Sequence, residues 1–327
     1  MRRFVICTAI AMVMVPSTAA FAQQEVVAPT AQPVQTQMQV ALQRVGDSRR
    51  TILRGSKIRV RGTVGAYVVG ERITVRFYSD QKRGSARSVA LLPGPDGTGR
   101  FALTYRAERS GRLVVRAVHA PTATLGELRA TAPSVDVLPR SVNASSRRHT
   151  VRGLQRRLSG LGYVVGSRGV YDARTQRAVL AFRKVTGMRR TTSASVQVMR
   201  RIAKGAGAFR IRRPSHGRHI EADLTRQVIA LISGGRVQRI YPISSGTSST
   251  PTVLGSFRVY RKTPGINSLG MVDSAYFIRG YATHGFSSVP IYPASHGCLR
   301  VPVPDARSLF NWIAIGTPVD VYYGPKP

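Results

Sequence analysis

Residues 281–285 and 295–300 of this sequence read YATHG and SHGCLR, and they decide how the C-terminal part of the chain folds. His284 lies fourteen residues before Cys298, near the end of a strand expected at residues 281–284. A return loop of that length can bring an imidazole beside a thiol, and two intervening prolines stiffen the loop. An imidazole within hydrogen-bond reach lowers the pKa of a thiol below its free value of about 8.5. The stretch therefore predicts a strand and loop that hold a reactive cysteine.

The residues around Cys298 can supply the other groups that a nucleophilic thiol needs. Such a thiol requires a base, a group that orients the base, and donors for the developing oxyanion. His284 is the candidate base, and Gly297 leaves the backbone bare, so that the amides of Gly297 and Cys298 can point at an oxyanion. Taken singly, His284 and His296 are more often structural histidines than bases, and only their combination with Cys298 and Gly297 favours catalysis. The spacing of the cysteine and the two histidines fits no common zinc pattern, so we expect neither a metal nor a cofactor.

The N-terminal residues have the pattern of a secretory signal peptide. Residues 1–22 contain two arginines, then an apolar run, then the small-residue pattern Ala20-Phe21-Ala22. An uncleaved anchor is the alternative, although this run is short for a membrane span and no later segment reaches about 20 apolar residues. Cleavage also removes Cys7, which leaves Cys298 as the only cysteine. That thiol can be reactive, can bridge two molecules, or can be an inert buried side chain. We therefore expect an exported chain with no transmembrane segment after cleavage.

The chain is strongly basic, with 50 Lys and Arg against 14 Asp and Glu and a formal charge of +36. Removal of residues 1–22 takes away two arginines and no acid, so the charge falls to +34. Such a field favours polyanionic surroundings. Nucleic acid is not expected as a partner, because no recognition module is evident and the basic residues are scattered. Anionic wall polymers or an anionic membrane surface fit an exported protein, and a generally solvated basic surface fits as well.

Composition and periodicity predict a multidomain chain that is mainly β. Residues 23–50, rich in Gln, Val, Pro and Ala, predict a flexible tether. Residues 51–140 contain short alternating runs separated by turn residues, which predicts an immunoglobulin-like β-sandwich that is a spacer or a wall-binding module. Residues 217–325 are again β-rich, with one helix near residues 305–315.

Residues 149–204 have helical periodicity, which predicts a bundle of three short helices. Asp172 is expected to be the N-cap of the second helix and Gly187 to end it. The motifs LQRRL, LGY and GVYD, followed by the pattern from Thr175 to Phe182, resemble the family of small three-helix peptidoglycan-binding domains. The resemblance implies that this segment binds peptidoglycan, and a bundle that serves only as a spacer is the alternative.

The C-terminal region resembles the catalytic domain of the L,D-transpeptidase (YkuD-like) family. The matching pieces are the segment from Ser245 to Phe257 and the two stretches quoted first. This resemblance implies a mostly β fold that acts on peptidoglycan stem peptides. It implies that Cys298 attacks the carbonyl of the third stem residue and expels the terminal D-Ala as a thioester forms. The side-chain amine of another stem then takes the acyl group, which gives a 3→3 cross-link.

The same resemblance assigns roles around Cys298. His284 is the base, and the carbonyl of Gly285 orients its imidazole. Arg300 binds the substrate or braces the loop. The residues that shape the pocket and the oxyanion site are Ser295, His296 and Gly297.

Two departures from the family pattern predict a differently shaped acceptor entrance. The gap between His284 and Ser295 is shorter than in several members, and extra residues precede Gly255. Two other functions stay open at this point. An L,D-carboxypeptidase would resolve the same acyl-enzyme with water, and a non-catalytic wall-binding protein would use only the accessory segments. The sequence does not reveal the diamino acid of the stem or the oligomeric state.

Overall fold

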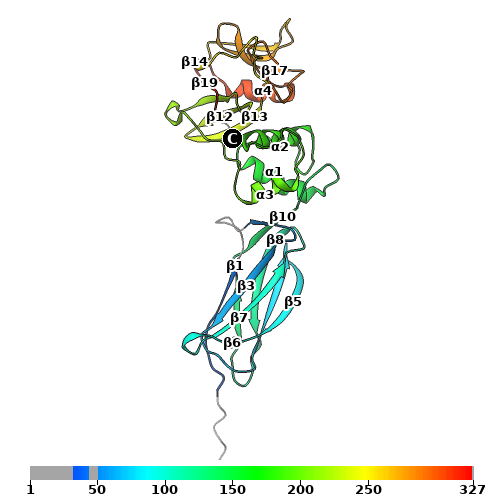
Figure 1. The fold of residues 1–327 in the computed structure, drawn as a ribbon, viewed down its shortest axis with the longest axis vertical. Helices are drawn as coiled ribbons and strands as arrows, with labels where there is room; N and C mark the ends of the chain where they lie inside the picture. The colour runs from blue at the N-terminus through cyan, green and yellow to red at the C-terminus, as the bar shows by residue number, and fades with distance from the viewer. Residues whose placement is uncertain (1–31, 44–50, 326–327) are drawn as a thin grey trace, which may run out of the picture.

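The structure is a computed structural model that describes residues 32–43 and 51–325. The expected signal peptide and most of the expected tether lie outside these residues. The described chain is elongated, with a β-sandwich at one end, three helices in the middle and a second β-rich region at the other end (Figure 1). The prediction of a mainly β chain with few helices is confirmed. No helix within the described residues is both long and apolar enough to cross a membrane.

Two sheets that share one apolar core form the first part of the molecule (Figure 1). The strands of the first sheet, in spatial order, are β1 (Met38–Gln43), β3 (Lys57–Val64), β7 (Gly99–Arg106) and β6 (Leu92–Pro93). The strands of the second are β2 (Thr51–Leu53), β10 (Val135–Leu138), β8 (Gly111–His119), β4 (Arg72–Ser79) and β5 (Lys82–Ala90), with β9 (Leu128–Thr131) also on β8. The alternation in β3 buries Ile58, Val60 and Val64, because successive side chains of a strand point to opposite faces.

Strand β1 lies inside the range for which the sequence predicted a tether. It pairs antiparallel with β3 from Met38 opposite Val64 to Gln43 opposite Arg59. Met38 is buried in the core, and Val40 and Leu42 pack against it. The alternation extends over only six residues, too few to stand out from the surrounding composition, and the partner strand supplies the hydrogen bonds that order the segment.

Three helices form the middle part: α1 (Arg148–Ser159), α2 (Ala173–Val185) and α3 (Val196–Ala203). The side chain of Asp172 accepts a hydrogen bond from the backbone N–H of Thr175, so the predicted N-cap of α2 is confirmed. Gly187, with φ of 66°, follows the end of α2 in the left-handed conformation that favours glycine. Leu154, Leu158 and Phe182 are fully buried between the helices.

The C-terminal part contains two sheets and one helix. The strands of its first sheet are β13 (Arg236–Pro242), β12 (Val228–Ser233), β11 (His219–Asp223), β19 (Pro318–Tyr322) and β14 (Gly255–Arg258). Those of its second are β15 (Arg261–Ile266), β16 (Val272–Ile278), β17 (Tyr281–Phe286) and β18 (Leu299–Pro302). Helix α4 (Val303–Trp312) begins with Pro304 in its first turn and packs against β16 and β17. The β17–β18 pair is parallel, and this pairing positions the candidate site.

The helices and the C-terminal region share one apolar core rather than meeting at a loose joint. Buried residues of β12 and β13, Val228, Ala230, Ile232 and Ile240, belong to the same cluster as the helix residues. Polar contacts reinforce this junction. Arg174 donates to Asp305 and to the carbonyl of Pro304, both at 2.6 Å, and Arg177 donates to the other oxygen of Asp305 at 3.1 Å.

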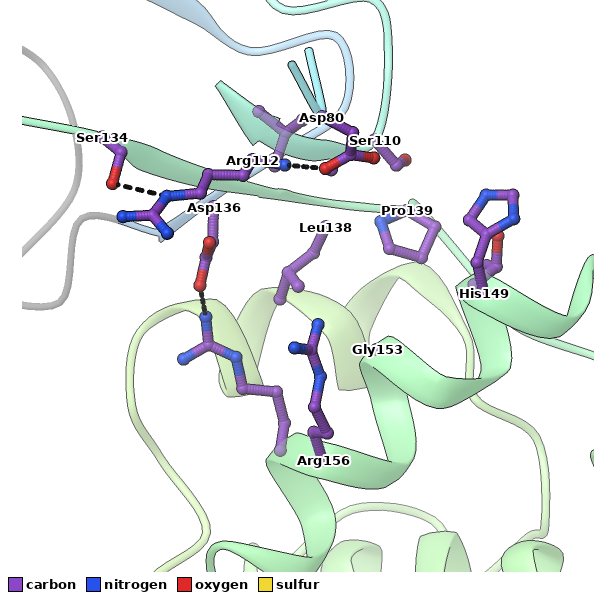
Figure 2. Close-up of a pocket in the computed structure, with 14 residues that line it drawn as sticks. Asp80, Ser110, Arg112, Ser134, Asp136, Leu138, Pro139, His149, Gly153 and Arg156 are labelled. Atoms are coloured by element: carbon purple, nitrogen blue, oxygen red, sulfur yellow. Dashed lines mark hydrogen bonds and ion pairs between the residues drawn. The ribbon is translucent and has the colours of Figure 1, made fainter. Parts of the chain in front are cut away.

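A cleft of about 770 Å³ separates the sandwich from α1 (Figure 2). Arg157 of α1 forms an ion pair with Asp136 of β10 across this cleft and donates a hydrogen bond to its carboxylate. The side chain of Arg156 extends from α1 into the space, and His149 lies on the same helix at the far end of the cleft (Figure 2). None of the residues that line this cleft belongs to the group around Cys298.

Candidate active site around Cys298

The parallel pairing of β17 with β18 brings His284 close to the turn that ends at Cys298, immediately before β18. His284 pairs with Arg300, and Cys298 lies two residues before Arg300. The intervening residue Leu299 is fully buried in the core. Cys298 itself packs against the small cluster that includes Ala282, two residues before His284 on β17.

The tautomer of His284 follows from its hydrogen bond. Its Nδ1 lies 2.9 Å from the carbonyl oxygen of Gly285, and because a carbonyl only accepts, Nδ1 carries the proton. The unprotonated nitrogen of the neutral ring is therefore Nε2. The imidazole is buried, and this burial lowers the pKa of His284, with the nearby positive charge of Arg300 acting in the same direction. The ring is thus favoured in its neutral form at neutral pH, with the carbonyl of Gly285 fixing the proton on Nδ1.

The thiol of Cys298 is less acidic than the sequence predicted. Burial raises the pKa of Cys298, and this effect outweighs a hydrogen bond from the Ala282 backbone and the positive charge of Arg300, which favour the thiolate. The thiol donates to the carbonyl oxygen of Gly280 at 3.7 Å. The expectation of a lowered thiol pKa is therefore wrong, because burial of the thiol itself raises the pKa of Cys298.

Gly297 has a conformation and a neighbour that only glycine tolerates. Its φ is 108°, and a Cβ there would lie 2.1 Å from Cε1 of Tyr281. Gly285 is also crowded, since a Cβ there would lie 2.5 Å from the side chain of Ala306 in α4. The two glycines allow the backbone beside His284 and beside Cys298 to approach the surrounding side chains closely.

Ser295 fixes the turn that carries Cys298. Its buried hydroxyl donates to the carbonyl of Cys298 at 2.6 Å and accepts from the backbone N–H of Gly297 at 3.1 Å. Thr250 donates from its hydroxyl to the carbonyl of Ser295 at 3.0 Å. The backbone N–H of Gly297, a predicted donor to the oxyanion, instead donates its hydrogen bond to the hydroxyl of Ser295 in this structure.

Arg300 holds the loop and lies close to both reactive groups. It donates to the carbonyl of Ala294 at 3.1 Å, and its guanidinium lies 4.1 Å from the ring centroid of Phe286. The ring of Phe286 meets the imidazole of His284 edge-on at 5.7 Å. His296, by contrast, is exposed on the turn before Cys298. These contacts make Arg300 a brace for the loop as well as a positive charge beside the thiol.

The predicted site residues therefore fall into two groups. Cys298, His284, Gly285 and Arg300 lie on or beside the paired strands, whereas Ser295, His296 and Gly297 form the turn that leads into β18. Two contacts were not predicted from the sequence: the carbonyl of Gly280 as the acceptor of the thiol, and Phe286 as the ring that contacts both His284 and Arg300. No local signal identified either residue, because both contacts arise from strand pairing. Among the described residues no group of three or more His, Cys, Asp or Glu is arranged to hold a metal ion.

Residues 217–321 match the YkuD family, which is described as the L,D-transpeptidase catalytic domain. The chain is also similar to the solved structure of residues 123–326 of an L,D-transpeptidase from Xylanimonas cellulosilytica. The identity is 35%, the match covers 56% of this chain and 98% of that one, and the TM-score is 0.51.

Two further solved structures are more distant. An L,D-transpeptidase from Stackebrandtia nassauensis is 19% identical over 57% of this chain and 97% of its own, with a TM-score of 0.35. Another from Mycobacterium tuberculosis is 22% identical over 32% of this chain and 57% of its own, with a TM-score of 0.31. Similarity at this level does not bear on function. No curated protein matches the chain significantly.

Proposed function

Because this chain belongs to the L,D-transpeptidase family, we propose that it is an exported transpeptidase that forms 3→3 cross-links in peptidoglycan, with Cys298 as nucleophile and His284 as base. One observation carries the assignment of the two residues. The register of β17 and β18 pairs His284 with Arg300, and Cys298, just before β18, packs against Ala282, two residues before His284 on β17. The carbonyl of Gly285 accepts the Nδ1 proton of His284 and leaves Nε2 without one. A half-buried neutral thiol and a neutral base on the same side of the sheet suit proton transfer that accompanies attack.

The first half-reaction forms an acyl-enzyme. Sγ of Cys298 bonds to the carbonyl carbon of the third residue of the donor stem as Nε2 of His284 takes the thiol proton. The amide bond to the terminal D-Ala then breaks, the amine leaves with the proton from His284, and a thioester remains on Cys298. The charge of Arg300 lies near the thiol and favours the negative charge that develops during attack.

The second half-reaction transfers the acyl group to an amine. The side-chain amine of a diamino acid in a second stem attacks the thioester carbonyl, gives its proton to His284, and releases the thiol. In this proposal Ser295, His296 and Gly297 shape the pocket, and Arg300 also attracts the carboxylate of the stem. No cofactor is needed for either half-reaction, because every proton and electron pair is supplied by the thiol, the imidazole or the substrates.

The other parts of the chain are proposed to bring the enzyme to its polymer. Residues 1–22 are proposed to be a signal peptide that directs export, and residues 149–204 a peptidoglycan-binding bundle. A weak binding module fused to a catalyst raises the local concentration of substrate. The sandwich at residues 51–140 is proposed as a spacer or a second wall-binding module, and the basic surface as a contact for anionic wall polymers.

The test is a product analysis. The mature protein is incubated with a disaccharide-tetrapeptide, and the products are separated and identified by mass spectrometry. A cross-linked dimer with release of D-Ala is the expected result. Tripeptide alone would instead assign an L,D-carboxypeptidase that uses water as acceptor, and unchanged substrate would support a non-catalytic wall-binding protein.

A matched variant connects the products to the thiol. Cys298→Ala should form neither product, and the intact mass of the wild type during turnover should show an acyl adduct that Cys298→Ala lacks. Turnover that persists in Cys298→Ala would overturn the assignment of the nucleophile.

A further inference from the structure

Helix α2 buries a lysine against the C-terminal region, and within the described ranges its side-chain nitrogen contacts two carbonyl oxygens and no carboxylate. Lys184 is 3% exposed, and its Nζ donates to the carbonyl oxygens of Gln227 and Ile243, each at 3.0 Å. Burial, with the nearby charge of Arg190, lowers the pKa of Lys184 to about 7. A neutral amine has two hydrogens, which match the two carbonyls that receive them. Burial of this amine is costly, so its two contacts call for an explanation beyond simple packing.

Gln227, whose carbonyl accepts a hydrogen bond from Lys184, has an unusual backbone conformation. It has a φ of 56°, in the left-handed region that residues other than glycine rarely adopt. Its buried side chain accepts from the backbone N–H of Ser245 at 3.0 Å and donates to the hydroxyl of Ser245 at 2.6 Å. Strained backbone of this kind persists where the surrounding contacts fix it. Lys184 contacts the backbone carbonyl of Gln227, and Ser245 contacts its side chain.

The hydrogen bonds continue from Ser245 to the nucleophile. The carbonyl of Ser245 accepts from the backbone N–H groups of Ala294 and Ser295, both at 2.9 Å. Ser295 in turn bridges the amide of Gly297 and the carbonyl of Cys298. A continuous buried path of hydrogen bonds therefore runs from α2 to the turn that carries the thiol.

A second contact from the same helical segment reaches the other end of this loop. Arg190, in the connection after α2, donates to the carbonyl of Ile291 at 2.7 Å and to the carbonyl of Thr225 at 2.9 Å. The helices thus hold the loop before Cys298 at two places. In contrast, Arg174 of α2 contacts Pro304 and Asp305 of α4, and its contacts do not include this loop.

We propose that Lys184 is a positioning residue, which through Gln227 and Ser245 holds the turn from Ser295 to Cys298 in its reactive geometry. The docked helices are then a working part of the active site in addition to any role in binding the polymer. The expected effect on turnover rests on the proposed transpeptidase function, whereas the expected effect on the conformation of the turn does not. Small displacements of a reacting group can reduce a rate by a large factor, so loss of this support should appear in turnover.

The experiment compares Lys184→Met with Arg174→Met in the mature protein. Both substitutions remove a polar contact between α2 and the C-terminal region, but only the first lies on the path to the turn. Hydrogen exchange of residues 291–300 is followed by mass spectrometry well below the melting temperature of each variant, together with kcat and KM for the disaccharide-tetrapeptide. We expect exchange in this segment to be about tenfold faster and kcat about tenfold lower in Lys184→Met, with KM within about threefold. Arg174→Met should leave both quantities close to those of the wild type.

Equal effects of the two substitutions on loop exchange would overturn the proposal, because Lys184 would then be only a docking contact. If Lys184→Met does not fold, Gln227→Met tests the same path. Where these variants fold, the kcat of the double variant Lys184→Met/Gln227→Met should be no lower than that of the slower single variant. Additive losses of kcat would instead show that the two residues act independently and would contradict the proposed path. If the wild type does not convert the tetrapeptide, the proposed function fails, yet loop exchange still decides whether Lys184 positions the turn.

Discussion

Nδ1 of His284 donates to the carbonyl oxygen of Gly285, 2.9 Å away, and this bond determines which nitrogen of the ring can accept a proton. If Nε2 takes the thiol proton, His284→Ala should lower the rate of acylation by about 100-fold or more. The rate is measured as the formation of the acyl adduct on Cys298 by intact-mass spectrometry. His149→Ala, on the exposed face of α1, is the matched control and should acylate at the wild-type rate on a soluble substrate. A loss of less than about threefold in His284→Ala would rule out this histidine as the base.

The opposite pKa shifts of the two reactive groups predict a specific pH profile. Burial lowers the pKa of His284 and raises the pKa of Cys298, so both groups are neutral around pH 7. Since the base must be unprotonated, kcat/KM should decline only below pH 6.5, the ordinary value for histidine, and should stay flat above it into the alkaline range. Alkylation by iodoacetamide, which needs the thiolate, should continue to rise above pH 9. Alkylation that is already maximal at pH 7 would instead indicate a thiolate–imidazolium pair.

Gly297 is predicted to be intolerant of any side chain. Gly297→Ala places a Cβ against Tyr281 and forces a non-glycine residue to a φ of 108°, so we expect loss of most acylation and a lower melting temperature. Replacing Tyr281 with Ala in the same chain removes the clash but leaves the backbone strain. The double variant should therefore recover part of the melting temperature, and full recovery would show that the clash alone matters. Calorimetry and the acylation assay measure the two effects.

A buried glutamate in the sandwich, Glu71, and its three hydrogen-bond partners predict how stability depends on acid. Hydrogen bonds from Thr122, Thr124 and His119 lower the pKa of Glu71 to about 2. The carboxylate is therefore favoured by folding, and its contribution to the free energy of unfolding is present above pH 4.5 and is lost as the pH falls toward about 2. The melting temperature of the mature wild-type protein is compared with that of the mature Glu71→Gln variant over this pH range. Glu71→Gln should melt at a lower temperature than the wild type at pH 7. The difference in melting temperature should become smaller as the pH falls from 4.5 toward about 2.

Local features of the fold were predictable from sequence, whereas the contacts between distant strands were not. Asp172 was identified as an N-cap because the signal lies within four residues, and the structure confirms it. The pairing of β17 with β18 joins segments separated by a loop, and its register determines that Gly280 accepts from the thiol. The predicted direction of the pKa shift of Cys298 was wrong for the same reason, since burial depends on which distant residues cover the thiol.

The shared core of α1 to α3 with β12 and β13 has a consequence for how such chains can be rearranged. Fully buried Val228, Ala230 and Ile232 lose their cover if the helices are removed, so a fragment that starts at residue 217 would present an apolar sheet face to water. Exchange of residues 149–204 for an unrelated binding domain would have the same result. The helical and catalytic segments of this protein therefore form one unit of recombination. Leu138 of β10 belongs to the same core, so an exchange of the sandwich alone would have to keep that residue in place.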